Sequence, residues 1–152
     1  MSEPTIRLIE PTEIRATAKV WQDSQRAAYT WFREDQRHPF DDALRFFRES
    51  VCERCDVWVA IDQERVVGLL ALEGATIDHL FVDPGHWELG IGSRLLEHAK
   101  DQHPAGLQLV TLQRNERARR FYEARGFVTT KFGVSPPPES EPDVHYRWSP
   151  ST

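Results

Sequence analysis

The segment from Thr76 to His103 constrains the fold most strongly, because it joins a strand to a helix through a turn rich in glycine and proline. Thr76–Val82 is apolar enough for a buried strand, and Asp83-Pro84-Gly85 ends it, since proline cannot continue a strand ladder. Apolar residues then recur at helical spacing from Gly90 to His103. This unit predicts a chain that mixes strands and helices.

The rest of the chain continues this mixture. Further strands are predicted at residues 5–9, 57–61, 66–72, 107–112, 127–134 and 144–148. Helices are predicted to begin at Pro11–Thr12, with Thr12 as the cap, at Asp41–Asp42 and at Glu116, and the last is expected to stop at Gly126. The order predicts an α/β fold with a mixed sheet and helices on both faces. A length of 152 residues fits one domain over residues 1–152.

Composition excludes several classes of protein. The net charge is −5, whereas a nucleic-acid binder needs a basic surplus, so we expect no nucleic-acid partner. No apolar run approaches the roughly 20 residues of a membrane span, so we expect no membrane contact. Met1-Ser2-Glu3-Pro4 does not resemble a signal peptide, and two cysteines do not form a disulfide framework, so we expect a cytoplasmic protein. No Cys/His cluster predicts a metal site, and Cys52 and Cys55 are interpreted as ordinary, partly buried cysteines.

The turn Gly90-Ile91-Gly92-Ser93 is a candidate anion site. Glycines let backbone N–H groups turn toward an anion, and the start of a helix adds partial positive charge. A tight turn before a packed helix explains the same pattern. It is not a P-loop, because no Gly-Lys-Ser/Thr follows, and Leu95 stands where a dinucleotide fingerprint needs a third glycine.

A second candidate segment follows the strand that ends at Leu112. Asn115 can cap the helix that begins at Glu116, and Tyr122 lies about two turns further on. On that helix the Tyr122 hydroxyl can lie near a leaving group, whereas a core aromatic beside Phe121 is the alternative.

Together the two segments resemble the GCN5-related N-acetyltransferase (GNAT) superfamily. Its Q/R-x-x-G-x-G/A pattern matches residues 87–92, where Trp87 replaces the usual Gln or Arg. Its pattern of Asn, then Ala, then Phe/Leu-Tyr-x-x-x-Gly-Phe matches Asn115, Ala118 and residues 121–127. Residues 80–84 look like the family's V-x-P strand, and the element order agrees from Thr5 to Trp148. The resemblance implies a GNAT-type, mostly antiparallel sheet over nearly the whole chain.

The resemblance also implies acetyl-CoA as the acetyl donor. The pantetheine arm would pair with the backbone of Leu80, Phe81 and Val82, and Asn115 would hydrogen-bond the arm. Tyr122 would protonate the departing thiolate. The pyrophosphate would lie on the backbone N–H groups of Glu88, Leu89, Gly90, Ile91, Gly92 and Ser93. Arg119 or Arg120 is the candidate for the 3′-phosphate of CoA. Because Trp87 replaces the usual Gln or Arg, the pyrophosphate is expected to depend mostly on the backbone N–H groups.

Direct acetyl transfer needs a base, because an alkylamine is mostly protonated at neutral pH. His79 is the first choice, since it lies on the strand beside the expected thioester and histidine has an ordinary pKa of about 6.5. A core histidine is the alternative. Glu73, at the end of the preceding strand, is the second choice, with a surface charge as its alternative. Strand alternation predicts that Asp78, the third candidate, points away from the face of His79.

The acceptor half comes from segments that family motifs do not cover. The expected acceptor is a primary amine of a small molecule, and the alternatives are a protein or peptide amine and a non-catalytic acyl-CoA sensor. A homodimer through the C-terminal strands is common in the family. The candidates for lining the acceptor site are the aromatic Trp21, Tyr29, Trp31 and Phe32, for which core packing is the alternative, and the acidic residues of the tail, Glu139, Glu141 and Asp143.

Overall fold

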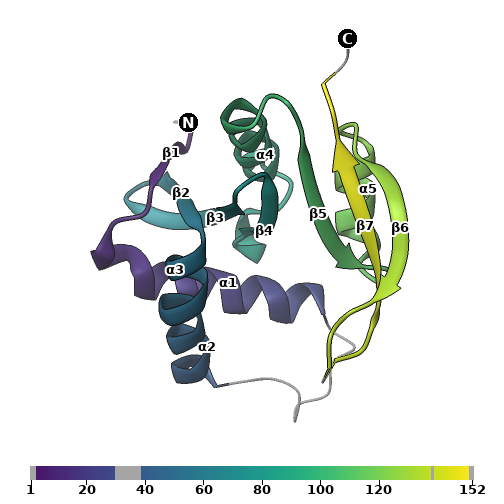
Figure 1. Cartoon of the computed structure of the whole chain (residues 1–152). Helices are drawn as coiled ribbons and strands as arrows, with labels where there is room; N and C mark the ends of the chain where they lie inside the picture. Colours follow the sequence, from purple (N-terminus) through teal and green to yellow (C-terminus); the bar gives the residue numbers. More distant parts are fainter. Residues whose placement is uncertain (1–2, 30–38, 138, 151–152) are drawn as a thin grey trace.

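The chain folds around one twisted sheet. The computed structural model describes residues 3–29, 39–137 and 139–150 of the chain. The described residues form seven strands in the order β1-β2-β3-β4-β5-β7-β6 (Figure 1). Every neighbouring pair is antiparallel except β4 and β5, which confirms the mixed, mostly antiparallel sheet. The strands are β1 (Thr5–Leu8), β2 (Asp56–Asp62), β3 (Arg65–Glu73), β4 (Thr76–Val82), β5 (Leu107–Leu112), β6 (Val128–Val134) and β7 (Pro142–Trp148).

Helices cover both faces of this sheet, as the sequence predicts. One face carries α1 (Ile14–Ala28) and α2 (Phe40–Phe46), which continues through the π-helical turn η3 (Phe47–Val51) into α3 (Cys52–Arg54). The other face carries α4 (Ile91–Gln102) and α5 (Glu116–Glu123). β3 lies between the two layers, because its alternate residues face opposite cores. Leu69 and Ala71 pack in the core of α1 and α2, and Leu70 and Leu72 pack in the core of α4.

The start of the first helical segment differs from the prediction. Thr12 lies inside the 3-10 turn η1 (Pro11–Glu13), and Glu10 is the capping residue. The backbone N–H of Glu10 donates to the Glu13 carboxylate at 2.9 Å, and Arg7 of β1 holds that carboxylate with two hydrogen bonds of 2.6 and 2.9 Å. Thr12 is therefore not the cap, because a carboxylate anchored to the first strand satisfies the free N–H group instead.

The two predicted signals around α5 are confirmed. The Asn115 side chain accepts a hydrogen bond from the backbone N–H of Ala118 at 3.1 Å, so it caps the helix. Gly126 has a φ of 93°, a left-handed conformation that suits glycine and ends the helix. These two signals fix where α5 begins and ends.

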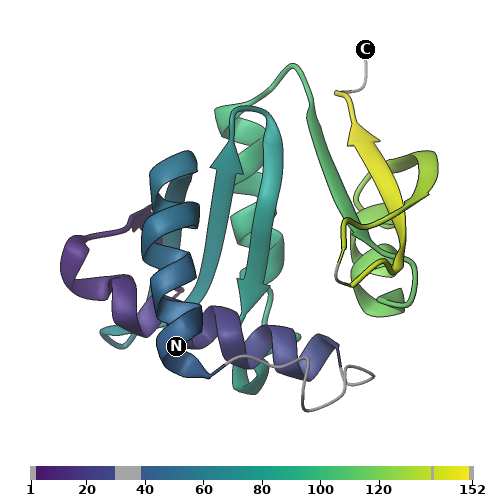
Figure 2. The same cartoon turned by 60° about the horizontal axis from the view of Figure 1, so that its bottom comes forward.

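β4 and β5 separate from each other soon after they start. They pair only at Thr76 with Gln108 and at Ile77 with Leu109, while β3 covers the opposite edge of β4 as far as Val82. Beyond this point β5, β7, β6 and α5 swing away from the β3–β4 hairpin (Figure 2). One edge of β4 from residue 78 to residue 82 therefore has no neighbouring strand among the described residues.

Candidate active site

Two cavities lie beside β4 and the C-terminal half of α1. The first, here called the Tyr122 cavity, has a volume of about 750 Å³ and lies between β4, the start of α4 and α5. The second, here called the His79 cavity, has a volume of about 800 Å³ and lies between α1, α2 and the β6–β7 connection. The consecutive residues His79 and Leu80 of β4 line different cavities, so the two cavities adjoin at this strand.

The Tyr122 cavity gathers most of the residues that sequence analysis assigns to the donor. Leu89 and Ile91 do not line it, because the Leu89 side chain is exposed to solvent and the Ile91 side chain is buried in the core. The predicted residues that do line it are Leu80, Phe81, Val82, Glu88, Gly90, Gly92, Ser93, Asn115 and Tyr122.

The glycine turn presents the start of α4 to this cavity. Gly90 has a φ of 84°, the left-handed conformation that a side chain disfavours, and it is the residue that precedes α4. A side chain at Gly92 would contact the Phe121 ring, because its Cβ would lie 3.4 Å from that ring. The N–H groups of the first turn have no partner within the helix, so they can bind an anion here.

The open edge of β4 offers backbone N–H and carbonyl groups to the Tyr122 cavity. The Val82 carbonyl is already occupied, because it accepts hydrogen bonds of 2.8 Å from the Ser24 hydroxyl and from the Trp87 indole N–H. Alternate residues of a strand direct their backbone groups to the same edge, so the N–H and carbonyl of Leu80 share this edge. Leu80 is therefore the residue of the strand whose backbone is best placed to bind an extended ligand.

Tyr122 has the properties of a proton donor. Its ring is buried and packs edge-on against Phe121 and Phe127, with ring centroids 5.2 and 5.3 Å away. The structure shows no hydrogen bond from its hydroxyl to any other described residue. Burial and the nearby Tyr29 raise the pKa of Tyr122, so the hydroxyl keeps its proton at neutral pH.

Asn115 joins the ends of two helices between the cavities. Its side-chain oxygen caps α5, and its side chain also forms a hydrogen bond with the hydroxyl of Tyr29, at the end of α1. Because the oxygen is used by the cap, the Asn115 NH₂ group is the natural donor to Tyr29. Tyr29 lines the His79 cavity, whereas Asn115 lines the Tyr122 cavity.

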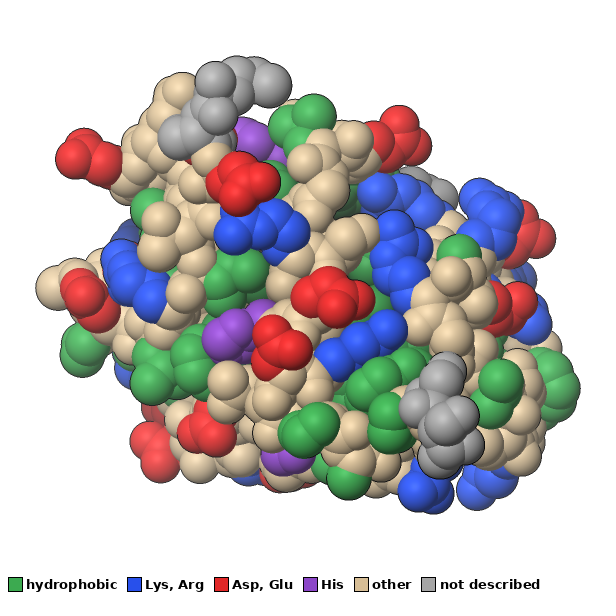
Figure 3. Space-filling view, turned by 90° about the horizontal axis from the view of Figure 1, so that it is seen from above, with side chains coloured by type: hydrophobic (Ala, Val, Ile, Leu, Met, Phe, Trp, Pro, Cys, Tyr) green, Lys and Arg blue, Asp and Glu red, His purple; other side chains and the backbone are tan. Residues whose placement is uncertain are grey.

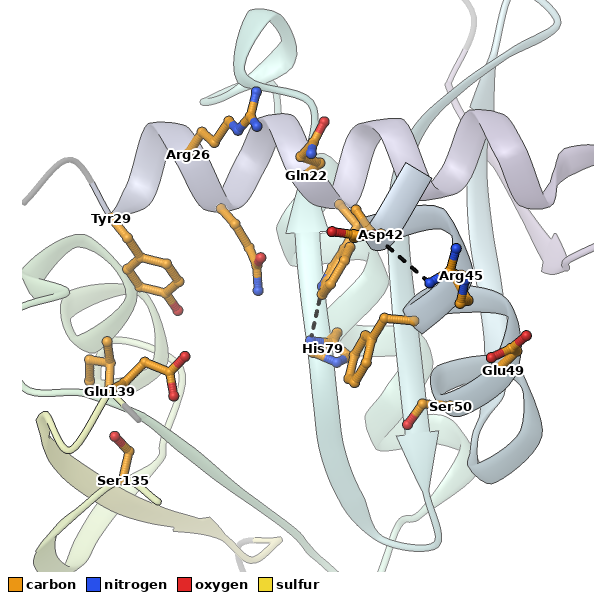
Figure 4. A pocket seen from close by; sticks show the side chains of 15 residues that line it. Gln22, Arg26, Tyr29, Asp42, Arg45, Glu49, Ser50, His79, Ser135 and Glu139 are labelled. Atoms are coloured by element: carbon orange, nitrogen blue, oxygen red, sulfur yellow. Dashed lines mark hydrogen bonds and ion pairs between the residues drawn. The ribbon is translucent and has the colours of Figure 1, made fainter. Parts of the chain in front are cut away.

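His79 is mostly buried and has a partner on each ring nitrogen. The Trp21 indole N–H donates to Nδ1 at the long distance of 3.4 Å (Figure 4). Nε2 lies 3.3 Å from the Asp78 carboxylate. Since Nδ1 accepts, Nε2 carries the proton in the neutral ring and donates to Asp78. Burial lowers the pKa of His79, so the ring is neutral at physiological pH.

The prediction that the Asp78 and His79 side chains point to opposite faces of the strand is wrong. The β3–β4 register shifts between Ala71 and Leu72, and this irregularity leaves Asp78 without a partner on β3. At such a bulge two residues of one strand oppose one residue of the other, which breaks the alternation of side chains. Asp78 therefore lies beside His79, although only His79 lines a cavity.

Glu73, the second candidate base, lies apart from both cavities. Half of its side chain is exposed, and its carboxylate pairs with Arg54 at 3.3 Å. The same guanidinium reaches Asp78 at 3.1 Å. Arg54 thus neutralises both carboxylates, and the structure does not bring Glu73 to the candidate site.

The lining of the His79 cavity is partly acidic. Tyr29, Ser135 and Glu139 face it from one side, and Asp42, Arg45 and Glu49 face it from the other (Figure 4). Trp21 and Glu139 line this cavity, Glu141 instead lies 4.0 Å from Arg114, and Trp31 and Phe32 lie outside the described residues.

Sequence reasoning missed the helical contribution to this lining. Asp42, Arg45 and Glu49 follow at positions i, i+3 and i+7, a spacing that places side chains on one face of a helix. That spacing was the available signal. Asp42 and Arg45 lie 3.9 Å apart, and Arg26 also lines the cavity, so the carboxylates of Asp42, Glu49 and Glu139 outnumber the guanidinium groups by one.

Other features of the surface stay unremarkable. Acidic and basic side chains are interspersed over the face shown in Figure 3, in keeping with the modest net charge. Within the described residues no helix is long and apolar enough to cross a membrane, and no three His, Cys, Asp or Glu side chains gather to hold a metal ion. Cys52 and Cys55 are free thiols, and burial raises the pKa of Cys55 to about 12, so it is not a reactive thiolate.

Comparison with protein families identifies the architecture. A family model described as an acetyltransferase (GNAT) domain matches residues 53–129, just over half of the chain. The chain belongs to the GNAT acetyltransferase family. The matched region runs from the end of α3 to the start of β6, so it contains β4, the glycine turn and α5 with Tyr122.

Relatives of this GNAT acetyltransferase have related sequences and the same fold. The peptidyl-lysine N-acetyltransferase YjaB of Escherichia coli strain K12 is 30% identical over 127 residues, which cover 83% of each chain. The solution structure of apo-form YjaB from Escherichia coli aligns with a TM-score of 0.83 and 26% identity over 99% of this chain and 100% of that one. The PaiA N-acetyltransferase from Thermoplasma acidophilum, solved in complex with coenzyme A, aligns with a TM-score of 0.76 and 17% identity over 99% and 100% of the two chains.

Proposed function

We propose that this protein transfers acetyl from acetyl-CoA to the side-chain amine of a lysine in a protein or peptide. The observation that carries the proposal is the kinship with YjaB, a relative named a peptidyl-lysine N-acetyltransferase, over 83% of both chains. This acceptor replaces the small-molecule amine expected first from the sequence. The two adjoining cavities support a transfer reaction, because each can hold one of two substrates beside β4.

The Tyr122 cavity is proposed to bind acetyl-CoA. A structural neighbour of the same fold was solved with coenzyme A, which supports this assignment. The pyrophosphate would lie on the N–H groups of the glycine turn from Glu88 to Ser93, and the pantetheine arm would extend along the open edge of β4. The Leu80 N–H is the proposed donor to the thioester carbonyl, because it lies on the edge of β4 that β5 leaves unpaired.

The chemistry follows from the order in which protons move. The neutral amine attacks the thioester carbon, a C–N bond forms, and negative charge gathers on the carbonyl oxygen, where a fixed N–H group stabilises it. His79 takes the amine proton at Nδ1, whose contact with Trp21 is long and therefore weak, while Asp78 stabilises the charged ring through Nε2. The C–S bond breaks, and Tyr122 gives its proton to the CoA sulfur.

The acceptor cavity suits a lysine side chain for electrostatic reasons. A lysine ammonium arrives charged, and Glu49 and Glu139 offer it carboxylates at the wall of the His79 cavity. A volume of about 800 Å³ holds more than a single amine, so it leaves room for the residues that flank the lysine. The ammonium gives up one proton to solvent before attack, and the proton released as the C–N bond forms goes to the buried, neutral His79 ring.

The test compares two panels of acceptors by the release of the CoA thiol. One panel contains lysine peptides paired with controls in which arginine replaces the lysine, and the other contains small primary amines. We expect a higher kcat/KM for lysine peptides than for every small amine, and no turnover of the arginine controls. A higher kcat/KM for a small amine would overturn the acceptor class, and acetyl-CoA binding without turnover on either panel would favour a sensor.

A further inference from the structure

Trp87 stands at the position where GNAT sequences usually carry Gln or Arg, and the structure shows how it is used here. Its indole N–H donates to the Val82 carbonyl at 2.8 Å, so the ring is fixed at the end of β4. The Arg117 guanidinium lies over this ring, with its Cζ 3.8 Å from a ring centroid. Both side chains line the Tyr122 cavity. A hydrogen-bonded tryptophan thus supports an arginine from the facing helix α5.

Four arginines line this cavity, and three of them have other partners within the described residues. Arg114 lies 4.0 Å from Glu141, Arg120 lies 3.9 Å from Glu116, and Arg125 donates two hydrogen bonds to the Ser93 hydroxyl and one to the Phe121 carbonyl. Arg117 makes no hydrogen bond or ion pair with any described residue.

The unpaired guanidinium is partly desolvated. Burial lowers the pKa of Arg117, and the charge of the nearby Glu88 opposes this effect without forming an ion pair among the described residues. An arginine stays protonated in any case, so its donors face the cavity charged and without partners. Stacking on an aromatic ring holds the planar guanidinium in one orientation, which suits two parallel hydrogen bonds to a phosphate.

We propose that Arg117, held against Trp87, binds the pyrophosphate of acetyl-CoA and supplies the side-chain contact that position 87 gives in other GNAT members. The place along the cavity favours the pyrophosphate, because Trp87 directly precedes the glycine turn at residues 88–93. The assignment of Arg119 or Arg120 to a phosphate is weaker. Arg119 lies outside the cavity lining and donates to the Tyr146 hydroxyl at 3.1 Å, and Arg120 is mostly exposed. The inference rests on the proposed binding of acetyl-CoA in this cavity.

The experiment measures the Kd of CoA and of 3′-dephospho-CoA by isothermal titration calorimetry, for the wild type, Arg117→Gln and Arg147→Gln. Arg147 is an exposed arginine on β7 and lines neither cavity. Its replacement by Gln removes the same charge as Arg117→Gln, so this variant controls for net charge. We expect Arg117→Gln to weaken both ligands about 10-fold, since a charged hydrogen bond to phosphate is lost. Arg147→Gln should stay within about 2-fold of the wild type, because screening weakens distant surface charges.

Each of the other possible outcomes contradicts one claim of this proposal. An equal Kd for Arg117→Gln and the wild type would overturn it while leaving the proposed function intact. A loss for CoA that disappears with 3′-dephospho-CoA would assign Arg117 to the 3′-phosphate and overturn the pyrophosphate contact. Failure of the wild type to bind either ligand would overturn the proposed function as well.

A double-mutant cycle tests the part played by the ring. Trp87→Leu should weaken CoA several-fold in the wild type, since the guanidinium is no longer held, and it should cost nothing further in Arg117→Gln. Equal losses in both backgrounds would show that Trp87 does not act through Arg117. Thermal unfolding of each variant establishes that the binding change is not a loss of folded protein.

Discussion

Replacement of Tyr122 by Phe removes one hydroxyl from the Tyr122 cavity and leaves the ring. The ring keeps its contacts with Phe121, Phe127 and Tyr146, whose centroids lie 5.2, 5.3 and 6.5 Å away. No hydrogen bond to a described residue is lost, so we expect the free energy of unfolding to change by less than about 1 kcal/mol. The protein should therefore fold as before.

The kinetic effect should be much larger than the effect on stability. Transfer of a proton by a positioned side chain contributes about 100-fold or more to a rate. A 100-fold fall in kcat corresponds to about 2.7 kcal/mol in the barrier. The hydroxyl is proposed to act on the sulfur end of the donor, so the Kd of acetyl-CoA should stay within about 2-fold of the wild type.

Tyr146→Phe is the matched control, because this second buried tyrosine lies outside both cavities. Its hydroxyl donates to Glu123 and accepts from Arg119, so its loss should cost about 1–2 kcal/mol of unfolding free energy and leave kcat nearly unchanged. Thiol-release kinetics and urea denaturation of both variants test the contrast. If Tyr122→Phe keeps kcat within about 2-fold, Tyr122 is a core aromatic and the proposed proton donor is wrong.

Three further variants probe the base, the cap and the glycine turn. Because burial lowers the pKa of His79 from 6.5, the ring stays neutral as the pH falls to 6.5, so kcat/KM of the wild type should decline only below that value. His79→Gln should lower kcat about 100-fold and remove this acidic limb from the pH–rate profile, whereas an unchanged profile would make His79 structural. Asn115→Ala should lower the free energy of unfolding by about 1–2 kcal/mol in urea denaturation, since α5 loses its cap; no change would contradict the capping role. Gly90→Ala places a side chain at a φ of 84° with no neighbour within 4 Å, so strain alone should cost about 1 kcal/mol and CoA binding should weaken. Gly74→Ala, at a φ of 58° and also without neighbours, should cost a similar amount and leave the Kd of CoA unchanged; equal Kd values for the two variants would argue against the role of the turn.

Local signals predicted the elements around the Tyr122 cavity well. The strand Thr76–Val82 has the predicted bounds because Gly74 and Pro84 border it, and α5 has its predicted start because Asn115 caps it. These features depend on residues only a few positions apart. The same locality explains why the short family pattern over residues 87–92 identifies the glycine turn.

Features that depend on tertiary contacts escaped prediction. The bulge at Asp78 arises from the register with β3. The capping by Glu10 depends on Arg7 of β1, which holds the Glu13 carboxylate in place. The wall of the His79 cavity joins α1, α2 and the β6–β7 connection, which are far apart in the sequence. The partner of Trp87 is likewise distant in the sequence, because Arg117 lies 30 positions further on, in α5.

The position of the transferred acetyl group tests the central proposal most directly. The wild type is incubated with ¹³C-acetyl-CoA and a peptide that has both a free α-amine and one lysine, and the product is mapped by tandem mass spectrometry. We predict one ¹³C-acetyl group on the lysine Nε, formed in step with CoA release and about 100-fold more slowly with Tyr122→Phe. Release of CoA with no label on the peptide, or label on the α-amine alone, would contradict acetyl transfer to lysine.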